Sequence, residues 1–117
     1  MSDVTAPETA NAARGEALLT IAGRAHLLRP SFTALVAAEE ELGPLFAMVE
    51  RAGGGQLRLG EIACLFWHCL AERAGLTRGD VGEAVMDVGL AGAAVPLRAV
   101  LHQILQGRPP AGSGQGM

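Results

Sequence analysis

Three side chains that can bind a metal ion lie close together in the sequence: Cys64, His68 and Cys69. On a helix, Cys64 and His68 would share one face because they are four residues apart. Cys69 would point elsewhere, and a closed tetrahedral zinc site would still lack a ligand. We therefore interpret the thiols as core groups and His68 as a boundary residue, and we expect no bound metal.

Other residue types used in catalysis are scattered. His26 and His102 stand alone in unrelated segments, and neither Ser31 nor Ser113 has a His and an acid arranged around it in the sequence. The glycine run at 53–55 lacks the spaced glycines and the following Lys-Ser/Thr of a phosphate loop. The sequence therefore predicts no catalytic residue, no cofactor and no enzyme activity.

Charge and hydropathy bear on the partners and the compartment. The net charge is −3 and the arginines are scattered, so no basic patch is present to attract nucleic acid. No secretory signal opens the chain, and no apolar run approaches the ~20 residues that span a bilayer. Cys64 and Cys69 would point about 140° apart on a helix, which opposes a disulfide. We expect a cytoplasmic protein that binds neither nucleic acid nor membrane directly.

The segment at about 58–75 is expected to be the central helix. Its apolar stripe is widened by Ala63, Trp67 and Ala74, and the stripe itself consists of Ile62, Leu65, Phe66, Cys69 and Leu70. One neighbouring helix needs an apolar arc of roughly 100°. The wider arc predicts contacts with two or more elements.

A β-hairpin is predicted ahead of this helix, with strands at 16–21 and 25–29 and a turn around Gly23, which tolerates positive φ. Pro30 should end the second strand, and Ser31 should cap the following helix.

That helix is predicted over 32–42, ending at Gly43-Pro44, with an inner face of Phe32, Leu35, Val36 and Leu42. Glu39 falls within the apolar stripe and should pair with a cation, Arg29 or Arg58, or with backbone donors. Glu40 and Glu41 are expected to be solvated.

Three further short helices complete the prediction. One runs over 45–52, one over 81–88 after a capping box at Thr77 and Asp80, and the last begins near Pro96. The last helix has its apolar stripe at Leu97, Val100, Leu101, Ile104 and Leu105, and Gly75 should cap the central helix.

The predicted fold class is α+β and mostly helical, with an N-terminal hairpin and about five short helices packed around the central one. We expect one globular domain over 15–106, a disordered lead-in at 1–14 and a flexible tail at 107–117.

Two blocks of sequence carry a family resemblance. The first is GEALLTIAGRAHLLRPSFTALVAAEEELG, and the second is LRLGEIACLFWHCLAERAG followed by LTRGDVGEAVMDVGLA. The matching positions of the first block, which we expect to be structural, are Leu28, Arg29, Pro30, Ser31, Phe32, Ala34, Leu35, Glu39, Leu42 and Gly43. In order and spacing the chain is similar to small gene transfer agent proteins grouped with phage tail assembly chaperones.

This resemblance implies a non-enzymatic chaperone of a phage-like particle that binds the tape-measure protein before the tail tube assembles. The major tail protein is a second candidate partner. The candidate partner-binding residues are Phe46, Met48, Trp67 and Met86. Met surfaces adapt to varied partners, while the alternative for Met48 and Met86 is that they fill gaps in the core or at its boundary.

Two alternatives remain open. One is a structural tail or connector subunit retained in the particle. The other, a DNA-binding regulator, is opposed by the acidic balance and by the lack of a basic recognition helix.

Overall fold

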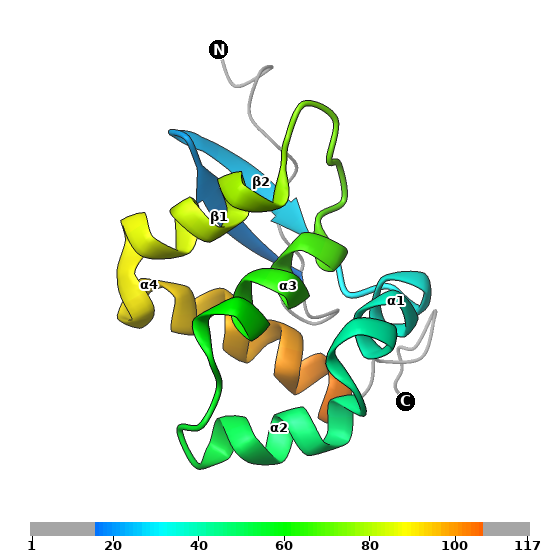
Figure 1. Ribbon diagram of the computed structural model, residues 1–117. Helices are drawn as coiled ribbons and strands as arrows, with labels where there is room; N and C mark the ends of the chain where they lie inside the picture. The colour runs from blue at the N-terminus through cyan, green and yellow to red at the C-terminus, as the bar shows by residue number, and fades with distance from the viewer. Residues whose placement is uncertain (1–15, 107–117) are drawn as a thin grey trace, which may run out of the picture.

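The computed structural model describes residues 16–106, so the lead-in at 1–14 and the tail at 107–117 lie outside the described residues. Within this range the chain forms a two-stranded hairpin and four helices (Figure 1). Their bounds are β1 Ala17–Ile21, β2 Arg24–Leu28, α1 Phe32–Leu42, α2 Leu45–Gly53, α3 Leu59–Cys69 and α4 Arg78–Gln106. The prediction of about five helices is wrong, while the mostly helical content and the hairpin are present.

The hairpin closes through a two-residue turn. β1 pairs with β2 in antiparallel register from Ala17 opposite Leu28 to Ile21 opposite Arg24. Ala22 and Gly23, between the strands, both have positive φ, 51° and 82°. Positive φ at both central residues defines the type I′ turn, whose twist matches that of the flanking strands.

The residues directly after α3 pair with strand β2 of the hairpin, so α3 is shorter than predicted. Leu70 forms an antiparallel bridge with Leu28. On either side of it, the Arg29 N–H donates to the Cys69 carbonyl at 2.6 Å, and the Ala71 N–H donates to the Leu27 carbonyl at 2.9 Å. The backbone that would have continued the helix pairs with β2 instead. The predicted end near residue 75 is therefore wrong, and Gly75 lies in the loop before α4.

Two of the predicted helices form one bent element. Within α4, only Gly89 has non-helical dihedral angles (φ 77°, ψ 166°), and the chain is helical again directly after it. A single glycine with positive φ redirects the axis without an intervening loop. The two helices predicted over 81–88 and from near Pro96 are thus separated by a one-residue kink, and Pro96 lies inside the helix rather than in a first turn.

The core is built around α3, as predicted. Leu65 and Phe66 are fully buried, and α3 packs against both α1 and α4. α4 also contacts β1 and α2. In Figure 1, α3 lies at the centre of the molecule, with the second half of α4 behind it and α1 beside it.

The inner face of α1 differs from the prediction. Ala38 is fully buried and Leu35 and Leu42 are partly buried, whereas Phe32 is 78% exposed and Val36 is exposed as well. On a helical wheel Phe32 lies about 120° from Ala38, and Val36 about 160°. The buried stripe of α1 is narrow and centred on Ala38, so the placement of Phe32 and Val36 inside is wrong.

Candidate functional site

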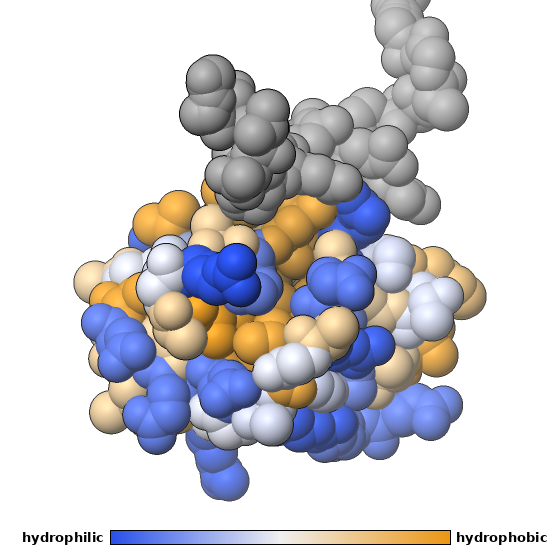
Figure 2. All heavy atoms as spheres, turned by 90° about the horizontal axis from the view of Figure 1, so that it is seen from above, coloured by the Kyte–Doolittle hydropathy of each residue, from blue (hydrophilic) through white to orange (hydrophobic). Residues whose placement is uncertain are grey.

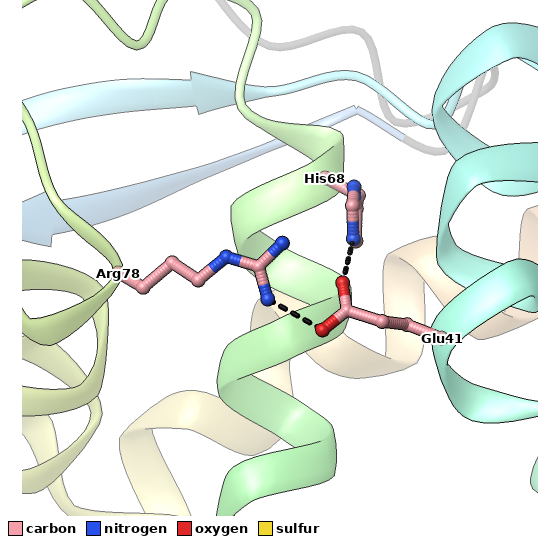
Figure 3. A network of polar contacts seen from close by, with 3 residues as sticks. All are labelled: Glu41, His68 and Arg78. Atoms are coloured by element: carbon pink, nitrogen blue, oxygen red, sulfur yellow. Dashed lines mark hydrogen bonds and ion pairs between the residues drawn. The ribbon is translucent and has the colours of Figure 1, made fainter.

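A polar cluster, here called the polar junction, joins three helices and consists of Glu41, Cys64, His68 and Arg78. Glu41 lies in the last turn of α1, Cys64 and His68 lie on α3, and Arg78 begins α4. One carboxylate oxygen of Glu41 lies 2.7 Å from Nε2 of His68, and the other accepts from Arg78 at 2.6 Å (Figure 3). Glu41 is exposed, as expected, but His68 and Arg78 engage its carboxylate, which the sequence did not predict. Arg78 is 37 positions away, so no local pattern could have revealed this pairing.

The charges of the polar junction shift its pKa values. Hydrogen bonds from Arg78 and then from His68 lower the pKa of Glu41 from 4.5 to about 2. Burial raises the pKa of the Cys64 thiol, and the charge of Glu41 raises it further. Because the thiolate is the nucleophilic form, Cys64 is poorly suited to covalent catalysis.

The polar junction also bears on metal binding. The ligand atoms of Glu41, Cys64 and His68 lie within 4.8 Å of one another, so the structure adds a carboxylate to the pair found in the sequence. However, both Glu41 oxygens are engaged, and the Arg78 guanidinium would repel a cation bound there. Cys69 does not join the cluster, since it is buried in the core and burial raises its pKa to about 12. That the protein binds no metal stays a prediction.

Trp67 adjoins the polar junction and is occupied by arginines of its own chain. The Arg73 and Arg78 guanidinium carbons lie 5.2 and 5.7 Å from the ring centroid. These distances allow cation–π attraction. Because the ring is also partly buried against the core, Trp67 offers little free surface to a partner.

The other candidate partner-binding residues separate into two groups. Phe46 on α2 and Met86 on the first half of α4 are 64% and 63% exposed. Met48 is fully buried, because two positions along a helix place it about 160° from the exposed Phe46. Met48 is a core residue, and only Phe46 and Met86 remain as exposed candidates.

Residues of the first resemblance block build the local structure around α1. Ser31 caps the helix by accepting from the Ala34 N–H at 3.2 Å, as predicted. Leu28 and Pro30 are buried, and Gly43 ends α1 with φ 84°. These four positions fix the path of the chain from the hairpin into and out of α1.

Glu39 pairs with a backbone donor. Its carboxylate accepts from the Leu45 N–H at 3.1 Å, at the start of α2. Of the two predicted cations, Arg29 bonds Glu16 at 3.0 Å, and the backbone N–H of Arg58 donates to Glu61 at 2.9 Å. Among the alternatives for Glu39, the structure therefore supports the backbone donor.

A surface pocket of about 320 Å³ opens between the start of α1 and the segment that follows α3. Its lining residues are Arg29, Ser31, Thr33, Ala34, Ala37, His68, Leu70, Ala71 and Arg73. No carboxylate lines it, and the Ser31 hydroxyl serves as the cap of α1. The pocket thus lacks the acid that would complete a Ser–His–acid arrangement.

The second half of α4 exposes several large apolar side chains. Leu90, Val95 and Leu105 are 60%, 65% and 54% exposed, although Leu105 was expected on the inner stripe. Apolar side chains also reach the surface between charged ones on the face seen from above the hairpin (Figure 2). Within residues 16–106, α4 alone is long and apolar enough to cross a membrane. The kink at Gly89 leaves a straight piece, 90–106, shorter than the ~20 residues of a span.

A comparison with known protein families identifies a match for this chain. Residues 14–107 match the family described as phage tail tube protein, GTA-gp10. No curated protein and no solved structure matches the chain. The matched family is one of phage tail proteins and not of enzymes. The match covers the hairpin and all four helices, and the chain therefore belongs to this gene transfer agent and phage tail protein family.

Proposed function

We propose that the protein is a tail assembly chaperone that binds the tape-measure protein before tail-tube subunits polymerise around it. The observation that carries this proposal is the exposure of large apolar side chains along the second half of α4, namely Leu90, Val95 and Leu105. Large exposed apolar areas on small domains mark interaction sites.

The apolar, helical character of the tape-measure protein fits binding to the exposed apolar side chains of α4. Tape-measure proteins of the resembled family are long, helical and apolar, so unassembled copies would aggregate. A helix with an exposed apolar side can pack along an amphipathic helix and cover its stripe. The charged residues on the rest of the domain would then keep the complex in solution.

A second candidate, a structural tail subunit, is favoured by the description of the family as a tail tube protein. The described sheet has only two five-residue strands, and Leu70 bridges one of them. It therefore offers no long strand edge for locking neighbouring subunits together, although a subunit could dock through its helices.

Co-expression tests the chaperone proposal. The tape-measure protein encoded by the same element is produced alone, with this protein, or with an unrelated acidic protein of similar size. The proposal predicts soluble tape-measure protein only with this chain, and recovery of the two as one complex. Insoluble tape-measure protein in all three cases would contradict it.

A further inference from the structure

The outer face of α4 contains a regular seam. Ala91, Val95, Arg98, His102 and Leu105 are all exposed, and their spacings along the helix are four, three, four and three residues. This is the a/d spacing of a coiled coil, in which side chains of one helix insert between those of another. At about 100° per residue the five positions fall within about 80° of the circumference. These five residues are called the outer seam.

The outer seam is separate from the stripe that holds α4 in the domain. Ala93, Pro96 and Val100 are buried against the core, while Leu97 and Ile104 pack partly against it. Within residues 16–106, the second half of α4 therefore has one side packed into the core and an opposite, exposed side that carries Ala91, Val95 and Leu105. Over 91–105 the outer seam is about 21 Å long at 1.5 Å per residue, roughly four helical turns.

Charge indicates the kind of helix that fits. The two polar positions of the outer seam are Arg98 and His102, and no Asp or Glu occurs anywhere between 88 and 106. In a symmetric pair of α4 helices, parallel or centred antiparallel, Arg98 would face Arg98 with no carboxylate on this stretch to offset it. A partner helix with carboxylates beside its apolar stripe would instead pair with the Arg98 guanidinium and could accept a hydrogen bond from the His102 ring.

We propose that the outer seam docks one amphipathic helix of another protein, with an apolar a/d stripe and Asp or Glu residues opposite Arg98 and His102. This inference rests on the proposed function, because it names the surface that would take a helix of the tape-measure protein.

Synthetic helices test the seam directly. Two fluorescent 28-residue peptides carry Leu at a and d and either Glu or Lys at e and g, so that like charges oppose self-pairing of each peptide. Fluorescence anisotropy at low salt should show about tenfold tighter binding of the Glu peptide, and added salt should narrow the difference. Equal binding of both peptides, or none, would overturn the inference.

Matched variants locate the contact. Arg98→Glu should reverse the peptide preference, whereas Arg24→Glu, at an exposed position of the hairpin, should not. Val95→Asp should abolish binding of the Glu peptide, whereas Leu59→Asp, an exposed apolar position at the start of α3, should not. Circular dichroism melts of all four variants identify any that fail to fold. A loss of binding shared by the folded control variants would contradict the assignment to the outer seam.

Two further measurements separate this inference from the proposed function. If the co-expressed tape-measure protein binds wild type and Val95→Asp equally, the outer seam is not its site and the inference fails alone. If the Glu peptide binds but the tape-measure protein does not, the seam is retained and the chaperone proposal fails. Sedimentation showing a dimer that Val95→Asp dissociates would assign the seam to a second copy and overturn the inference.

Discussion

The polar junction and the outer seam of α4 differ in whether their side chains contact other side chains of the described chain. At the polar junction, Glu41 engages His68 and Arg78 from the same chain, and both of its oxygens are used. In the outer seam, Val95 and Leu105 face outward, and no carboxylate of α4 lies near Arg98 in sequence.

This difference indicates which of the two regions stabilises the fold and which is free to bind a partner. The polar junction contains residue types that are used in catalysis and metal binding. These side chains bind one another, however, and so connect α1, α3 and α4. The outer seam contains no such cluster. Its apolar side chains and the charge of Arg98 are exposed and have no intramolecular role among the described residues. We therefore associate stability with the polar junction and partner binding with the outer seam.

Two valines, one on the buried side and one on the exposed side of α4, allow the two roles to be compared within one helix. Val100 is fully buried and Val95 is 65% exposed, so the same substitution can be made on both sides of α4. Val100→Ala should cost about 2 kcal/mol of unfolding free energy through lost burial and a cavity. Val95→Ala should change it by less than about 0.5 kcal/mol while weakening binding to a partner helix. Urea unfolding and peptide titration of both variants would refute the comparison if the two costs were equal.

Glu39 tests whether an acid of α1 can serve the fold without any ion pair. Glu39→Leu removes the acceptor of the Leu45 N–H and should cost about 1 kcal/mol, as for loss of a helix cap. Glu39→Gln retains a carbonyl acceptor and should cost less than half as much. Chemical denaturation of both variants makes the measurement, and an equally large loss in Glu39→Gln would show that the charge itself matters.

The turn offers a stabilising change remote from both regions. Ala22 has φ 51°, a conformation that Asn tolerates better than Ala. Ala22→Asn should therefore raise the unfolding free energy by about 0.5 to 1 kcal/mol. Because the turn is not part of the outer seam, binding of the Glu peptide should stay the same. A change in peptide affinity that follows stability would undermine the separation of the two roles.

The polar junction should reveal itself in the pH dependence of stability. The pKa of Glu41 is lowered in the folded state, from 4.5 to about 2, so its stabilisation is fully present above pH 4.5. It is lost as the pH falls from 4.5 towards 2. Glu41→Gln should therefore melt below wild type at neutral pH, with the difference narrowing through that window. The neighbouring exposed Glu40→Gln should show no such window, and a difference for Glu41→Gln that is constant from pH 7 to 2 would disagree with the account.

Local signals explain what the sequence predicted correctly. The Gly23 turn, the Ser31 cap and the capping box of Thr77 and Asp80 each depend on residues a few positions apart. The central position of α3 follows from its wide apolar arc, because such a helix must pack on several neighbours.

Long-range contacts explain the errors. The early end of α3 depends on the pairing of Leu70 with Leu28, and the role of Glu41 depends on Arg78, far along the chain. The sequence predicts two separate helices where α4 bends at Gly89, because a glycine looks the same in sequence at a kink and at a break. The spacing of the outer seam was present in the sequence, but only the structure shows that this side of α4 is exposed.

The central claim, that the protein acts before the tail is complete, is tested most directly by locating it. Mass spectrometry of purified particles, compared with lysate of the producing cells, gives its stoichiometry in each. The account predicts the protein in the lysate, where it co-purifies with the tape-measure protein, and its absence from finished particles. Recovery in particles in fixed proportion to the tail subunits would contradict the account and establish a structural subunit.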